Sequence, residues 1–486
     1  MRIITAILLC YFSYVVSGQC PEGRVELRTQ ADVDQFGLDW PNCQEINGSV
    51  EIGYPKVTPL GEVVSICTTE SDITNLRGLR NIRRITRDLI INCVPDLGSL
   101  RGLDNLEVVE RLFEIELMPD LKDFSGLERF KVQNGNFFIN APNLASFEGL
   151  DSLRKGVNLR ITTEKFLNFS GLKSLKELLR FSLSGYTLFE NFDSLQIVSS
   201  FGFGNNDTIE HFNYLERFGM AELDGLSMGN NPKLKKVSLP KSLTSVNSLQ
   251  LINLSNMPNL DGFKKIGEVE KLRIVGLSRL KNLSGLENLK TVHRRAINDG
   301  IIIEELDSLI SLEGIGLEEV KSSLIIRENP LLIDVTAIEG IYFSRPSGDN
   351  YPVLWIKDNP NLSNCVNETI CDLAKNAPHS LDISGNGPGC SSITEILEAC
   401  ALVSTEDVSD IPQASISLYP NPAHDWVMIR GVAELRSIRL LDMMGRQLRY
   451  SSSDRMDLTD LDAGMYVVQI EDQKGSIHTE KLIIRK

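Results

Sequence analysis

One short pattern of apolar and polar positions recurs through most of the chain. It reads apolar, any residue, apolar, a few mostly polar residues that often include proline, and then leucine, as in Leu89–Leu97 and Phe113–Leu121. The pattern starts at Leu89, Phe113, Phe137, Leu159, Phe181, Phe201, Leu226, Ile252, Leu272, Ile301, Leu324, Leu354 and Leu381. The mean spacing is about 24 residues, which predicts a solenoid whose coils bury their apolar faces against one another.

A second apolar phrase lies between these segments. It begins with Gly-Leu and ends on an apolar residue, as in Gly102–Leu106 and Gly285–Leu289. Each coil is therefore expected to hold one short strand, a turn and a second apolar ridge. Stacking the coils places their strands in one parallel sheet. The pattern thus predicts a mainly β fold built as a parallel β-solenoid.

The alternation within each strand predicts which side chains leave the core. Side chains of a strand point alternately to its two faces, so the residue between the two apolar positions should point outward. This outward column reads Ile90, Glu114, Phe138, Arg160, Ser182, Gly202, Ser227, Asn253, Arg273, Ile302, Ile325, Trp355 and Asp382. The position just after the second apolar residue should also point outward, and late in the chain it supplies Val275, Glu304, Arg327 and Lys357.

The late part of the outward column turns apolar beside charged neighbours. Trp and Arg are the residue types most enriched at binding hot spots, and exposed apolar groups tend to mark contact sites. The sequence therefore predicts a binding face formed by Arg160, Arg273, Ile302, Ile325, Arg327, Trp355 and Lys357. In the alternative interpretation a loop such as 343–350 folds over this strip and makes it core.

The chain begins with the features of a secretory signal. Arg2 precedes an apolar run from Ile3 to Val16, and small residues lead to Gly18, where cleavage is expected. No later stretch is long and apolar enough to predict a membrane span.

Of the nine cysteines, Cys10 lies in the expected signal, and the other eight form an even set that predicts disulfides in an oxidising compartment.

The cysteines bracket the two ends of the repeat region. Cys20 and Cys43 form the natural pair at the front, around a polar stretch that suits a short helix. The four cysteines at the back allow three pairings. We favour Cys365 with Cys390, because they occupy nearly matching places in successive repeats, and Cys371 with Cys400. Cys67 and Cys93 are then left for each other.

The composition changes after the last cysteine. Residues 401–414 include a polar, acidic run and are expected to be a linker. Residues 415–486 show closely spaced alternating strands that predict a small β-sandwich.

The formal net charge of -15 argues against nucleic acid as a partner, because phosphate contact requires a basic face.

One motif suggests catalysis. Gly225–Gly229 matches the G-x-S-x-G nucleophile elbow, with Ser227 as the nucleophile. That motif works on a sharp strand-to-helix turn, whereas here the serine occupies the strand position of a repeat and Asn-Asn-Pro follows. The five histidines are scattered and no metal-binding spacing is present, so we expect no enzyme activity, metal or cofactor.

Two parts of the chain resemble known families. Residues 20–400, with phrases at Val25–Asp34, Ile46–Gly48 and Asp72–Leu76, resemble the receptor L-domain type of leucine-rich repeat in its bacterial branch. The tail resembles the type A carboxy-terminal sorting domain of the type IX secretion system, through Leu418–Pro422, Leu441–Arg446, Leu461–Val468 and Lys481–Ile484. Its motif positions are Pro420, Asn421, Pro422, Gly445, Gly464 and Tyr466.

The residue patterns and these resemblances together imply an exported protein with four segments. They are a signal peptide at 1–18, a solenoid at 19–400 with disulfide-bonded caps, a linker at 401–414 and a sorting domain at 415–486 that engages the secretion machinery. We expect a secreted or cell-surface protein that binds an extracellular protein or glycan on its sheet face. The alternatives are a structural envelope protein without a specific ligand and a serine hydrolase that uses Ser227.

Overall fold

A computed structural model describes most of the chain, in two compact units. The described residues are 20–57, 66–164, 167–185, 189–190, 197–216, 220–293, 300–344, 352–403, 417–421, 423–430, 435–442, 446–473 and 477–484. The first unit comprises Met1–Ala337, Phe343–Asn364 and His379–Ser391, and the second comprises Ile338–Tyr342, Cys365–Pro378 and Ser392–Lys486. The expected signal peptide and most of the expected linker lie outside the described residues.

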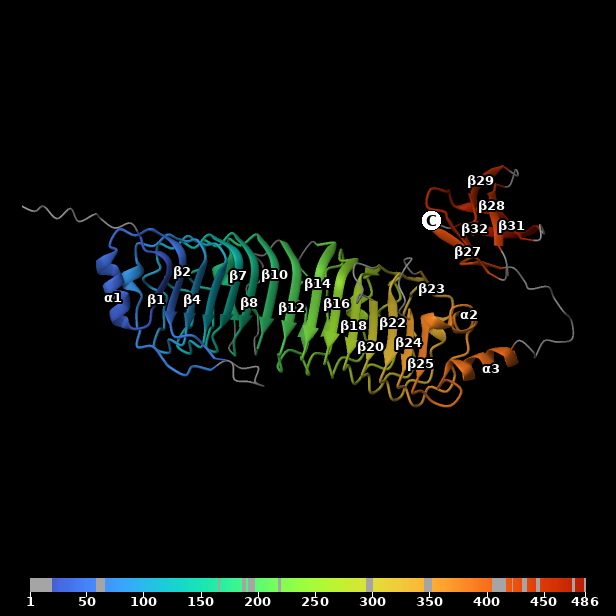
Figure 1. Ribbon diagram of the computed structural model, residues 1–486, viewed down its shortest axis with the longest axis horizontal. Helices are drawn as coiled ribbons and strands as arrows, with labels where there is room; N and C mark the ends of the chain where they lie inside the picture. Colours follow the sequence, from blue (N-terminus) through green and yellow to red (C-terminus); the bar gives the residue numbers. More distant parts are fainter. Residues whose placement is uncertain are drawn as a thin grey trace, which may run out of the picture. The chain divides into compact units, whose positions relative to one another are not determined.

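The first unit is built on long parallel strands that lie side by side in chain order (Figure 1). Each pairs with the next in parallel register, and successive coils stack through this sheet. These strands are β1 (Glu22–Leu27), β2 (Glu45–Gly53), β4 (Asp88–Asn92), β6 (Leu112–Glu116), β7 (Val132–Asn140), β8 (Lys155–Thr162), β10 (Glu177–Ser184), β12 (Ile197–Gly204), β14 (Glu222–Gly229), β16 (Ser245–Ile252), β18 (Lys271–Val275), β20 (Gly300–Glu304), β22 (Ser323–Arg327), β24 (Leu354–Lys357) and β25 (Leu381–Ser384). The parallel β-solenoid expected from the repeat period is confirmed.

Short strands and 3₁₀ turns complete the coils. The same sheet includes β3 (Arg84–Ile85), β5 (Val108–Val109), β17 (Glu268–Val269), β19 (Thr291–Val292), β21 (Glu319–Val320) and β23 (Tyr342–Phe343). Two separate pairs are formed by β9 (Leu167–Asn168) with β11 (Phe189–Glu190) and by β13 (His211–Phe212) with β15 (Lys236–Val237). The 3₁₀ turns are η1 (Arg77–Leu79), η2 (Ser170–Leu172), η4 (Asp261–Phe263), η5 (Thr336–Ile338) and η6 (Pro378–Ser380).

The repeated apolar positions fill the core between coils. Phe113 and Phe137 begin successive pattern matches, and their rings stack at a centroid distance of 4.6 Å. The Gly-Leu phrase has a steric cause, since Gly102 adopts a φ of +112° and an added Cβ would lie 2.2 Å from the Leu76 carbonyl. Glycine therefore permits the close approach of neighbouring coils at this turn.

The front of the solenoid starts earlier than the pattern indicated. Strands β1 and β2 pair in register with each other and then with β4, which holds the first match, so two coils precede Leu89. Helix α1 (Gln30–Asp39) lies between them, where a short helix was expected. Thr29 and Asp32 form a capping box at its first turn. Burial raises the pKa of Asp32, but hydrogen bonds from the Thr29 and Arg28 backbone amides outweigh it, and the pKa lies below its ordinary value.

One expected strand start is wrong. The sequence places a pattern match at Ile252, but β16 pairs Leu249 with Leu226 on one side and with Leu272 on the other. Both Leu249–Leu251 and Ile252–Leu254 read apolar, any, apolar, and only the pairing with neighbouring strands separates them. Gln250 therefore takes the outward position expected for Asn253, which turns out of the strand with a φ of +54°.

Three of the expected disulfides are present as paired. They join Cys20 to Cys43, Cys67 to Cys93 and Cys371 to Cys400. Cys365 and Cys390 are each disulfide-bonded as well.

The Cys371–Cys400 bond links two helices of the second unit. These are α2 (Glu368–Asn376), capped by Asn367, and α3 (Ile393–Val403). Helix α3 extends three residues into the expected linker, because Ala401–Val403 continue its apolar sequence before the polar run begins.

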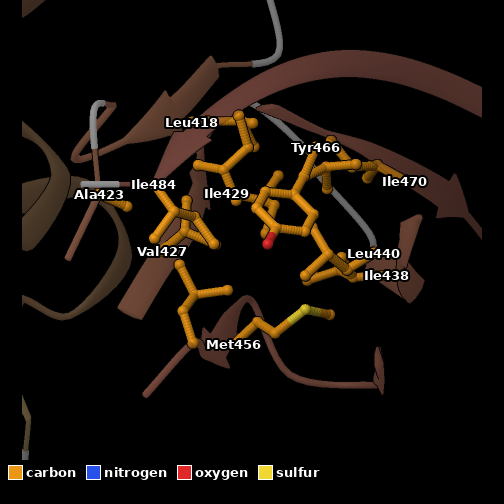
Figure 2. Close-up of a cluster of buried hydrophobic side chains, with 13 residues drawn as sticks. Leu418, Ala423, Val427, Ile429, Ile438, Leu440, Met456, Tyr466, Ile470 and Ile484 are labelled. Atoms are coloured by element: carbon orange, nitrogen blue, oxygen red, sulfur yellow. The ribbon is translucent and has the colours of Figure 1, made fainter. Parts of the chain in front are cut away.

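The C-terminal part of the second unit holds two antiparallel sheets. One contains β26 (Ser417–Tyr419), β27 (Trp426–Arg430) and β30 (Arg455–Asp457), and the other contains β28 (Leu435–Leu441), β29 (Gln447–Ser451), β31 (Gly464–Asp472) and β32 (Ile477–Ile484). Figure 2 shows the core they share, in which Leu418 and Val427 of the first sheet lie with Ile438, Tyr466 and Ile484 of the second.

Candidate functional site

The sheet register aligns the predicted face along the solenoid. Parallel pairing places Arg160 beside Phe138 and Ser182, and further along it places Arg273, Ile302, Ile325 and Trp355 in consecutive strands. Except at β16, the outward column is the one that the alternation indicated. It begins before Ile90, with Glu26 and Glu51 of the two additional strands.

The front of this face is occupied by ion pairs. The Lys56 ammonium lies 3.1 Å from Oε1 of Glu114 and also contacts Glu116. Burial lowers the pKa of Lys56, but its hydrogen bonds to Glu116 and Glu114 outweigh this and raise the pKa above its ordinary value. Arg111 likewise pairs with Asp88 at 2.7 Å. Because these charges neutralise one another, they offer few groups to a partner.

The late apolar strip consists of Ile302, Ile325 and Trp355. All three side chains are partly exposed, each directly beside the next in the parallel sheet. The indole Nε1 of Trp355 donates to the Pro352 carbonyl at 2.9 Å, and the Lys357 ammonium lies 5.5 Å from the indole ring centroid. In the alternative interpretation the loop at 343–350 covers the strip. Residues 345–350 of that loop lie outside the described residues.

The column beside this strip differs from expectation at two positions. Val275 and Glu304 were expected to point outward but are buried, whereas Arg327 is exposed and Lys357 is partly exposed. Glu304 tolerates burial because Nη2 of Arg327 lies 2.5 Å from its carboxylate. Lys357 pairs with Asp382 at 3.2 Å. The charges beside the strip are therefore already partnered.

A small carboxylate cluster lies next to that column. Glu304, Glu305 and Glu328 bring ligand oxygens within 4.8 Å of one another. Arg327 contacts both Glu304 and Glu328, the latter at 4.0 Å. An arginine already balances part of the negative charge, so this cluster gives no reason to assign a metal.

The structure reveals a feature of the sheet face that the sequence pattern did not indicate. A hollow of about 850 Å³ lies over β10, β12 and β14, in the middle of the solenoid. Its floor consists of small residues of those strands, among them Ser182, Gly202 and Ser227, which occupy consecutive outward positions. Longer side chains border it, including Phe138 and Arg160 on one side and Gln250 on the other.

The hollow combines neutral hydrogen-bonding groups with apolar side chains. Serine hydroxyls and asparagine and glutamine amides line it, together with the partly exposed ring of Phe138 and the exposed Leu179. Its charged lining residues are Arg160, Arg180 and Asp224. The run of Ser and Gly in the outward column is the sequence feature that could have indicated this hollow. A run of small residues forms a hollow only where neighbouring coils carry longer side chains, and the sequence pattern did not show which side chains those are.

Ser227 lies on the floor of this hollow, within a regular strand. It pairs with Gly202 on one side and Gln250 on the other, and β14 continues beyond it to Gly229. Asn230 then turns with a φ of +54°, and no helix follows in the described segment up to β15. The strand-to-helix turn of a nucleophile elbow is thus not formed here.

The motif residues of the tail hold its last strand and its core together. Nδ2 of Asn421 donates to the Lys481 carbonyl at 2.6 Å, and its Oδ1 accepts from the Ile483 amide at 2.9 Å. The buried Tyr466 donates its hydroxyl proton to the Asp462 carbonyl at 2.7 Å, beside Gly464. Pro420 precedes Asn421 directly, and Pro422 and Gly445 lie outside the described residues.

Comparison with protein families identifies this part of the chain. Residues 417–485 match the secretion system C-terminal sorting domain. The sorting domain marks the protein for export through the type IX system, to be released or held at the cell surface. No curated protein matches the chain. Within the described residues, no helix has the length and apolar character needed to cross a membrane.

Proposed function

We propose that the protein is a non-enzymatic binding protein that its sorting domain delivers to the cell surface or beyond. We assign the solenoid to the L-domain type of leucine-rich repeat because its repeats resemble that family, and the tail to a small β-sandwich that engages the secretion machinery. The hollow over β10, β12 and β14 supports this function best, because ligands bind preferentially at concave sites with convergent polar groups.

The chemistry of the hollow favours a glycan. Sugar hydroxyls both donate and accept hydrogen bonds, as do the hydroxyl of Ser182 and the amides of Asn158 and Gln250. The apolar face of a sugar ring can pack on the partly exposed ring of Phe138. Arg160 supplies donors from the border of the site. No step of this binding requires a nucleophile or a titrating group.

Filling the hollow tests the proposal. A glycan array probed with the secreted protein should identify neutral oligosaccharides that bind, and Ser227→Trp should weaken binding by about tenfold or more, since an indole would occupy the floor. Ile90→Trp is the matched control, because it adds the same ring to the outward column several coils away. Wild-type affinity in Ser227→Trp, or the absence of any bound glycan, would refute the assignment.

The late strip supports a second candidate, in which the partner is a protein. Ile302, Ile325 and Trp355 form a line of partly exposed apolar side chains that suits a protein contact better than a sugar. A purely structural envelope role predicts no saturable ligand at either place. The hydrolase alternative is tested with a serine-reactive fluorophosphonate probe, and labelling of Ser227 would overturn the non-enzymatic proposal.

A further inference from the structure

A second hollow lies on the connecting segments of the solenoid and has a different chemistry. It encloses about 970 Å³ between the segments that follow β14 and β16. Five lysines line it, namely Lys235, Lys236, Lys241, Lys264 and Lys265, against two carboxylates, Glu216 and Asp261. The whole chain has 50 basic and 65 acidic residues, so this excess of positive charge runs against the average.

Most of these lysines form no ion pair with the described part of the chain. Lys235 pairs with Glu210 at 2.8 Å. The other four, Lys236, Lys241, Lys264 and Lys265, are exposed and form no ion pair with any residue that the structure describes. Like charges gathered around one hollow repel each other, and an anion bound there would relieve that repulsion.

The rim is held on a rigid base. Val237 and Phe263 are buried directly beside rim lysines, one on each of the two segments. Gly262 lets these segments meet, since an added Cβ would lie 2.2 Å from the Val237 carbonyl oxygen. The backbone positions of the lysines are thus fixed by core packing before any ligand arrives, which lowers the entropic cost of binding.

We propose that this lysine-rimmed hollow binds an anionic polysaccharide. Lysines act as separate, strongly hydrated point charges, whereas bidentate recognition of phosphate favours arginine, and none of the described residues that line the hollow is an arginine. Carboxylate or sulfate groups spaced along a sugar chain match such a ring of charges. A concave rim suits a chain that enters it better than a flat bilayer, and the exported protein meets polysaccharides outside the cell. The site is independent of the sheet-face hollow.

Dextran sulfate and uncharged dextran have the same sugar backbone, so comparing them distinguishes binding to the sulfate charges from binding to the sugar. The full secreted protein should be retarded in gels that contain dextran sulfate but not in gels that contain dextran. Replacing four lysines together, with Lys236→Gln, Lys241→Gln, Lys264→Gln and Lys265→Gln, should weaken dextran sulfate binding by about tenfold or more. Raising NaCl from about 0.05 to about 0.5 M should abolish most of the wild-type binding.

A control variant removes the same charge elsewhere. Lys122→Gln, Lys176→Gln, Lys281→Gln and Lys375→Gln change exposed lysines outside the hollow and should reduce the affinity by less than about twofold. Ser227→Trp should bind dextran sulfate like the wild type, which keeps this result separate from the sheet-face proposal. Equal losses in the two quadruple variants, or tighter binding to duplex DNA or to phosphatidylglycerol vesicles than to dextran sulfate, would overturn the proposal.

Discussion

The side-chain amide of Asn359 donates to Oδ1 of Asn386 at 3.0 Å, although these residues are 27 positions apart in the chain. Oδ1 of Asn359 accepts in turn from the side-chain amide of Asn329 at 3.1 Å, and Asn359 also donates to the Lys357 carbonyl at 2.8 Å. Asn329 and Asn359 are fully buried. The three asparagines thus form a ladder that satisfies backbone groups at the turns following β22, β24 and β25.

Breaking this ladder should destabilise the solenoid. Asn359→Ala removes the acceptor of the Asn329 backbone amide and leaves buried polar groups unsatisfied, which costs about 1–3 kcal/mol. Denaturant unfolding of the purified protein measures this loss. Asn361→Ala is the control, because its amide donates to the Pro330 carbonyl at an exposed position and should cost less than about 1 kcal/mol. Equal losses in the two variants would contradict a special role for the ladder.

The bond between α2 and α3 should contribute strongly to stability. Cys371 and Cys400 are 29 residues apart, and a loop of that length stabilises by about 3–4 kcal/mol in the chain-entropy model. Cys371→Ser with Cys400→Ser should therefore lower the melting temperature by several degrees. Thiol titration of the secreted protein should find none of the eight cysteines from Cys20 to Cys400 free. An unchanged melting curve would show that this bond is dispensable.

The sorting domain should be required for delivery and dispensable for folding of the solenoid. Its two sheets share a core of their own, and deletion of residues 415–486 should leave a folded solenoid in the periplasm. Protease accessibility on intact cells, combined with fractionation, measures delivery. Asn421→Ala, which removes two hydrogen bonds to β32, should reduce delivery without abolishing it. Normal surface delivery of the truncated protein would be incompatible with the sorting role.

Trp355 should be a binding residue if a protein partner uses the late strip. Trp355→Ala removes the ring that lies beside Lys357 and should weaken partner binding by about 2 kcal/mol, the scale of a hot spot, while secretion and folding persist. Affinity for a partner captured by residues 20–400 measures this. Ile333→Ala, an exposed apolar residue outside the strip, should have little effect. If the Trp355→Ala protein unfolds or fails to accumulate, the indole is required for packing of the core and not for binding.

Repetition made much of this protein readable from its sequence. Apolar and polar residues alternate along a strand that is buried on one face. With one exception, at Ile252, the apolar, any, apolar segments therefore indicated both a strand and its outward residue, as for Arg160, Arg273 and Trp355. Cys20 and Cys43 were paired because they bracket one polar stretch, and Cys67 and Cys93 were left for each other; both pairs are present. The tail was recognisable because its short phrases occur in order.

Contacts between coils decided what the sequence left open. Two overlapping segments fitted the pattern at β16, and only hydrogen bonding to β14 and β18 selected Leu249 over Ile252. The sheet-face hollow depends on the same contacts, because its depth is set by side-chain lengths at positions some 20–25 residues apart that stacking makes adjacent. Alternation gives a residue's direction from its own strand. The side chains that surround that residue belong to neighbouring coils, and the repeat period alone does not determine the register between the strands of those coils.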